Sequence, residues 1–122
     1  MNEMPAILRL AAGAAAHAAN RQGVIATNVA NADTPGFHAR DMNPFVVDDG
    51  FQLRRADERH LAGTSRQSEV FKLRNAAVDP NGNTVDLEDQ VLRGIEAARA
   101  HNQAITVYRN NLDILRTALG RR

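Results

Sequence analysis

The chain of 122 residues contains no cysteine and no tryptophan, and aromatic residues make up only 4% of it. Without cysteine it cannot form a disulfide, a thiolate nucleophile or a zinc–thiolate site. Hydrophobic residues account for 43% of the chain, but many of them are alanine, which buries little area. We therefore expect long helices in thin packing, or packing completed by other subunits, rather than a thick globular core.

A strong charge of one sign is also absent, as is any long hydrophobic run. The net charge is +1, so charge indicates neither nucleic acid nor an anionic membrane as a partner. No apolar stretch approaches the length of a membrane span. The alanine-rich segment after Arg9 resembles a weak secretory signal, but Glu3 precedes it and the helical pattern continues beyond it. We expect no cleaved signal peptide.

The C-terminal part of the chain carries a long heptad pattern. From Leu87 onward the pattern steps alternately by 4 and 3 residues, and only Gly94 and His101 on this face are not apolar. The positions are Leu87, Val91, Gly94, Ala98, His101, Ile105, Tyr108, Leu112, Leu115 and Leu119. Such a heptad seam predicts a long helix that packs against another helix.

Both ends of this helix are indicated by the sequence. Thr84 can cap the first free N–H groups, and acidic residues at 86, 88 and 89 suit the positive end of the helix dipole. Gly120 can adopt the left-handed conformation that follows many helices. The predicted helix therefore covers residues 84–119.

The N-terminal part has a second pattern of the same kind, with smaller side chains. Its positions are Met4, Leu8, Ala11, Ala15, Ala18, Gln22, Ile25, Val29 and Ala32. Pro5 suits a first helical turn, and Pro35-Gly36 predicts a turn in which the glycine has a positive φ. We predict a helix over residues 5–32 in which small residues allow close approach of the partner.

Residues 33–83 comprise the turn motif and a less regular segment. Residues 45–47 and 51–53 could form short strands on either side of an Asp-Gly turn, and residues 69–73 alternate polar and apolar side chains. The predicted fold is all-α: the two heptad-patterned helices pack together, and a short irregular loop or β-hairpin lies between them. We expect residues 1–122 to be one unit.

We take the apolar positions of the two patterns as candidates for helix packing between and within subunits. The candidate packing residues are Leu8, Ile25, Val29, Leu87, Val91, Ile105, Tyr108, Leu112 and Leu115.

No pattern points to chemistry. The four histidines, His17, His38, His60 and His101, lack the i, i+4 spacing of a helical metal site. No glycine-rich phosphate loop or nucleophile elbow is present. We therefore expect no catalytic residue, no metal, no cofactor, no small-molecule substrate and no nucleic-acid partner.

Two stretches resemble a known family. The run NVANADTPGF at residues 28–37 is similar to the N-terminal signature of bacterial flagellar rod and hook proteins, and NGNTVDLE at residues 81–88 resembles the opening of the last helix in the small proximal-rod subunits. Asn81 and His101 depart modestly from the family pattern. The resemblance assigns an assembly motif to Asn28, Asn31, Thr34, Pro35, Gly36 and Phe37.

The resemblance implies a structural subunit of the basal-body rod that assembles helically with itself and with other rod subunits. It further implies contacts with the membrane ring and the export gate, a periplasmic location, and type III export without a cleaved signal. A soluble helical adaptor or export chaperone that binds partner helices through the same faces is the alternative. A small enzyme is a remote third possibility.

Overall fold

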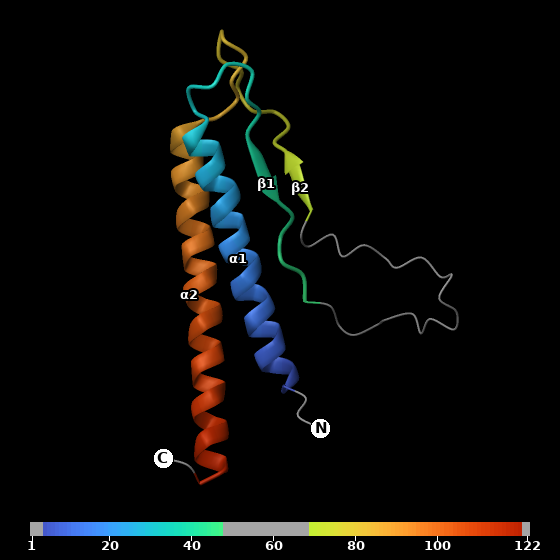
Figure 1. Ribbon diagram of the computed structural model, residues 1–122, viewed down its shortest axis with the longest axis vertical. Helices are drawn as coiled ribbons and strands as arrows, with labels where there is room; N and C mark the ends of the chain where they lie inside the picture. The colour runs from blue at the N-terminus through green and yellow to red at the C-terminus, as the bar shows by residue number, and fades with distance from the viewer. Residues whose placement is uncertain (1–3, 48–68, 121–122) are drawn as a thin grey trace, which may run out of the picture.

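The computed structural model describes residues 4–47 and 69–120, and within them two long helices and two short strands follow the order α1, β1, β2, α2. The elements are α1 (Ala6–Ala30), β1 (Arg40–Met42), β2 (Val70–Lys72) and α2 (Leu87–Ala118). The helices run antiparallel side by side, and the strands lie along the C-terminal half of α1 (Figure 1). The predicted pair of packed helices is thereby confirmed.

Helix α1 begins after Pro5, whose carbonyl accepts hydrogen bonds from the N–H groups of Leu8 at 3.0 Å and Arg9 at 3.1 Å. It ends at Ala30, two residues before the predicted boundary. The chain then turns sharply, and Gly36 has a φ of +73°, as the Pro-Gly sequence predicted.

Helix α2 begins three residues later than predicted because its N-cap is Asp86 and not Thr84. The Asp86 side chain accepts hydrogen bonds from the N–H groups of Glu88 at 3.0 Å and Asp89 at 3.5 Å. The Thr84 hydroxyl is used elsewhere, since it accepts a hydrogen bond from Ala39 N at 2.9 Å. At the other end Gly120 has a φ of +70°, as expected for a residue that follows a helix.

Alanines form most of the contact between the helices. The buried apolar side chains of the two helices are Leu8, Ala11, Ala15, Ala18, Ile25, Ala97 and Ala104. Because alanine projects only a methyl group, the two helix axes can approach closely along this line. The small-residue face predicted for the N-terminal helix is therefore the face that packs from Leu8 to Ile25.

The packing face of α2 is rotated from the predicted seam. Its buried residues are Gln90, Ala97 and Ala104, whereas Leu87 and Val91 are 53% and 60% exposed. Neighbouring residues are 100° apart around a helix. The contact therefore follows one edge of the broad apolar face, because Gln90 pairs with Asn28 of α1 and the alanines permit the closest approach.

Strands β1 and β2 pair antiparallel, with Asp41 opposite Phe71, and form a two-stranded hairpin. Strand β2 lies inside the predicted 69–73 segment, but its partner is β1, which the sequence reading missed. Residues 45–47 are not a strand, and residues 51–53 lie outside the described residues. The hairpin between the helices is thus confirmed, but one of its strands was predicted in the wrong place.

Candidate functional site

The side chain of Asn28, at the end of α1, links three elements. Its Nδ2 donates to the Arg40 carbonyl at 2.7 Å and to Gln90 Oε1 at 2.8 Å, and its Oδ1 accepts from Arg40 N at 3.0 Å. Asn28 is 1% exposed, so these groups have no ready access to water. A buried amide that makes all these bonds fixes the relative positions of α1, β1 and α2.

Asn83 has the same role on the segment that leads into α2. Its Nδ2 donates to the carbonyls of Asn31 at 2.9 Å and Thr34 at 2.8 Å, and its Oδ1 accepts from Val85 N at 2.7 Å. The side chain is completely buried. It therefore holds the turn after α1 against the start of α2.

Backbone hydrogen bonds complete this contact. Gly36 N donates to the Asn81 carbonyl and Thr84 N to the Phe37 carbonyl, each at 3.0 Å. We call Asn28, Asn83, Thr84 and Gln90 the polar junction. The two stretches that resemble rod proteins, residues 28–37 and 81–88, thus lie against each other in space at one end of the molecule (Figure 1).

The predicted assembly motif divides into buried and exposed residues at this junction. Asn28 is buried, Asn31 and Phe37 are half-buried, and Thr34, Pro35 and Gly36 are exposed. The Asn31 side chain also donates to the Thr27 carbonyl at 2.8 Å and accepts from the Thr34 hydroxyl at 3.2 Å. Half of the motif therefore presents a rigid turn at the surface.

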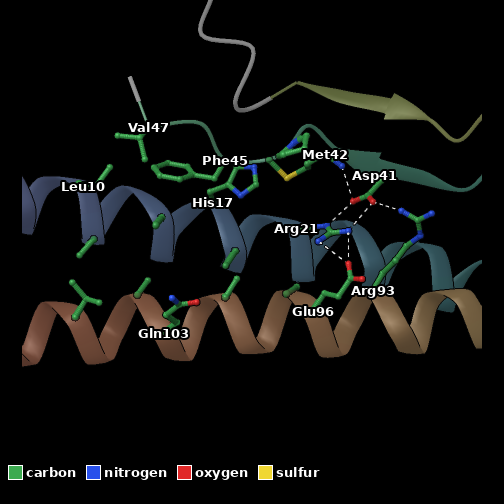
Figure 2. Close-up of a pocket in the computed structure, with 18 of the residues that line it drawn as sticks. Leu10, His17, Arg21, Asp41, Met42, Phe45, Val47, Arg93, Glu96 and Gln103 are labelled. Atoms are coloured by element: carbon green, nitrogen blue, oxygen red, sulfur yellow. Dashed lines mark hydrogen bonds and ion pairs between the residues drawn. The ribbon is translucent and has the colours of Figure 1, made fainter. Parts of the chain in front are cut away.

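A buried carboxylate joins the same three elements beside the junction. Asp41 of β1 accepts from Arg21 of α1 at 2.9 and 3.0 Å, and it also pairs with Arg93 of α2 (Figure 2). Arg93 contacts Asp89 at 2.7 Å, and Arg21 contacts Glu96 at 3.4 Å. Sequence reasoning missed this cluster because its three central residues are far apart in the chain.

The cluster lowers the pKa of Asp41. Burial alone would raise the pKa of this carboxyl, but the hydrogen bond from Arg21 opposes it. The Met42 N–H and the Arg93 guanidinium lower the pKa further, and the net result lies below the ordinary value of 3.8. Asp41 is therefore charged at neutral pH, although only 4% of its side chain is exposed.

An apolar groove of about 690 Å³ follows one flank of the helix pair and ends at the Asp41 cluster. Alanines 14, 18, 97, 100 and 104 line it, and Phe45 and Val47 border it (Figure 2). His17 fixes the bordering segment, because its Nε2 hydrogen-bonds to the Asn43 carbonyl at 2.7 Å and its ring lies 5.6 Å from that of Phe45. The charged side chains at the end of the groove already form ion pairs with one another. The rest of the groove is mainly apolar and is therefore suited to packing against another protein surface.

The candidate packing residues fall into three groups. Leu8 and Ile25 are buried against α2; Ile105, Tyr108, Leu112 and Leu115 are half-buried; and Val29, Leu87 and Val91 are exposed. Within one chain, then, only part of the predicted set contributes to packing. The role of the set in contacts between subunits stays a prediction.

Neither a metal centre nor a membrane span is found in the described part of the chain. No group of three or more His, Asp or Glu side chains in residues 4–47 and 69–120 could hold a metal ion. In the same residues neither helix is long and apolar enough to cross a membrane. His60 lies outside the described residues.

Comparison with known proteins identifies the family. Residues 8–38, which include the whole of the first motif, match the family of flagella basal body rod proteins. The chain is 34% identical over 93 residues to the flagellar basal body rod protein FlgB of Agrobacterium fabrum, covering 67% of this chain and 69% of that protein.

Two further relatives carry the same name. The identity to FlgB of Aeromonas hydrophila is 38% over 79 residues, or 57% of this chain and 59% of that protein. For FlgB of Salmonella typhimurium it is 27% over 127 residues, covering 92% and 91%. The chain therefore belongs to the family of flagellar basal-body rod proteins of the FlgB type.

Proposed function

We propose that this protein is a structural subunit of the proximal basal-body rod, and that its α1–α2 pair packs laterally against the helices of neighbouring subunits. One observation carries the proposal: apolar surface lies open on both flanks of the same helix pair. Such surface on a small structural protein indicates protein contacts.

The two flanks are placed by the helical repeat of α2. Glu96 and Gln103 line the groove, and each precedes a buried alanine by one residue. Val91 and Ile105 each follow a buried residue by one. Since one residue corresponds to 100° around the helix, the groove and the Val91–Ile105 side lie on opposite flanks.

Opposite flanks with different shapes favour an open assembly. Alanines of the two helices line the groove, while large side chains stand out at the start of α2, where Leu87, Val91, Leu92 and Ile95 are exposed. A protruding face that packs into a recessed face elsewhere on the next copy is a heterologous contact. Repetition of such a contact yields rings or helical assemblies rather than closed dimers.

The family membership leads us to propose the surroundings as well. The subunit lies in the periplasmic rod, reaches it by type III export without cleavage, and contacts other rod subunits, the membrane ring and the export gate. Its role is structural and not catalytic. These proposals rest on the resemblance of residues 28–37 and 81–88 to rod subunits.

Detection of the chain in detergent-resistant basal bodies tests the function. We expect the chain to co-purify with basal bodies and to retain Met1 or its immediate successor as the N-terminal residue. Recovery only in complex with a flagellar export substrate in the cytoplasmic fraction would instead support an adaptor or chaperone.

A further inference from the structure

The hairpin and the bend that follows β2 carry exposed positive charge without ion-pair partners. Arg40 of β1 and Lys72 of β2 are directly opposite each other in the register, and both are exposed. Arg74, two residues beyond Lys72, is exposed as well. Across residues 4–47 and 69–120, none of the three forms an ion pair, in contrast to Arg21, Arg93 and Arg116.

This arrangement is unfavourable for an isolated hairpin. Directly opposite residues of an antiparallel pair project on the same side of the sheet, and like charges in this position repel each other. The hairpin has only three residues in each strand, so little backbone pairing offsets the repulsion. An anionic surface placed against these side chains would remove the repulsion between them.

The chain itself has such a surface at the junction end. Asp33 lies in the turn after α1, Asp79 in the turn before Asn83, and Glu88 in the first turn of α2, and all three are exposed. Figure 1 shows the two turns at the same end of the molecule, and the Gly36–Asn81 hydrogen bond joins them. Among the described residues these three carboxylates have no ion-pair partner, whereas Asp41, Asp89, Glu96 and Asp113 all pair with arginine.

We propose that the basic hairpin face of one copy, formed by Arg40, Lys72 and Arg74, docks on the acidic end of a second copy, formed by Asp33, Asp79 and Glu88. The inference rests on the proposed rod function, for which it supplies one specific contact between copies. Charge complementarity identifies the occupant. The two surfaces are different parts of the chain, so the contact is heterologous and can repeat from copy to copy.

We expect this contact to fix the relative position of neighbouring copies and to contribute little to the affinity between them. Exposed ion pairs contribute little individually, but opposite potentials on two surfaces steer association and disfavour other registers. The rigid polar junction supports this role, because Asp33 and Asp79 are carried by turns that Asn83 and the Gly36–Asn81 hydrogen bond hold in place.

Charge reversal in the full chain, expressed in cells that lack it, tests the proposal. One variant is K72E/R74E, a second is D79K/E88K, and the third combines all four substitutions. We expect each double variant to reduce the amount of chain in purified basal bodies about tenfold, and the combined variant to restore most of it, because every copy then carries both reversed surfaces.

The matched control is R9E/R99E, which also reverses two exposed arginines without an ion pair in the described structure. We expect wild-type incorporation from this control. Thermal unfolding of the purified variants should be close to wild type, since all substituted side chains are exposed. Binding of the chain to vesicles of anionic phospholipid is measured in parallel.

Several outcomes would overturn the inference. If wild-type chain is in basal bodies and the combined variant is not restored, the basic face contacts a different molecule. If K72E/R74E incorporates normally, the face is not used. If K72E/R74E loses vesicle binding and the combined variant stays defective, the occupant is a membrane surface. If wild-type chain is absent from basal bodies, the proposed rod function is contradicted, and the proposed contact between copies is contradicted as well.

Discussion

Asn28 and Gln90, which are 62 positions apart in the sequence, share a buried hydrogen bond of 2.8 Å between their side-chain amides. This bond connects the last turn of α1 to the first turns of α2. With Asn83 and Thr84 it makes the two motifs of the family a single structural unit. The residues that resemble a family signature thus have a definite physical task, which is to fix how the chain leaves one helix and enters the other.

Substitution of Asn28 by alanine should destabilise the folded chain by about 2–3 kcal/mol, because it removes the partner of the buried Gln90 Oε1 and of the partly buried backbone N–H and carbonyl of Arg40. Urea unfolding followed by circular dichroism measures the effect. Asn20→Ala is the control, since Asn20 is exposed on the same helix. Equal midpoints for the two variants would show that the polar junction does not stabilise the fold.

Substitution of Ala97 by leucine should prevent the close approach of α1 and α2. Ala97 is 1% exposed, and a larger side chain there costs roughly 1–3 kcal/mol through strain. The matched variant is Ala12→Leu, at an exposed position of α1. The melting temperature should fall for Ala97→Leu and change little for Ala12→Leu. A rise for both would indicate that the alanine contact is loose.

Asp41→Asn should cost on the order of 2 kcal/mol at neutral pH, because Arg21 and Arg93 then lose the charge between them and both are only partly exposed. The pKa of Asp41 is lowered in the folded state, so its stabilising effect is present above its unfolded pKa. The effect is lost as the pH falls through the lower folded pKa.

A pH series of unfolding midpoints checks this sign. The difference between wild type and Asp41→Asn should stay constant from about pH 5 to 8 and shrink below about pH 4, where the Asp41 carboxyl takes up a proton in the unfolded chain before it does so in the folded chain. A difference that grows on acidification would contradict the pKa direction.

A charge at Ile105 should abolish motility by blocking rod assembly. Ile105 is half-buried on the flank opposite the groove, and an aspartate there would place a charge in the proposed contact with a neighbour. The readout is swimming in soft agar, with protein level checked by immunoblot. Normal swimming of cells that carry Ile105→Asp would exclude that flank as an essential contact.

Periodicity and turn chemistry were sufficient for the main architecture. The steps of 4 and 3 residues between small and apolar side chains predicted α1, and Pro35-Gly36 predicted the turn after it, because both signals act through local geometry. The cap of α2 was predicted wrongly for a non-local reason: the Thr84 hydroxyl bonds to Ala39, so the next suitable side chain, Asp86, becomes the N-cap.

The remaining features depend on contacts between distant segments. Strand β1 was missed because its burial follows the ion pairs of Asp41 with Arg21 and Arg93 and not an alternating pattern. The predicted seam of α2 is rotated from the line of residues that is buried against α1. Apolar residues occupy both that buried line and the open flank beside it. A sequence pattern does not distinguish the two destinations, packing within the chain and packing between chains.

The measurement that tests the central claim most directly is the amount of Val91→Asp chain in purified basal bodies, compared with that of Asn20→Asp. Val91 is exposed on α2, and Asn20 is exposed on the side of α1 that faces away from α2, so neither substitution should disturb the fold of the chain. If the open apolar flank packs against neighbouring rod subunits, Val91→Asp will be absent from basal bodies and Asn20→Asp will be present at the wild-type level. Equal incorporation of both variants would contradict assembly through this flank.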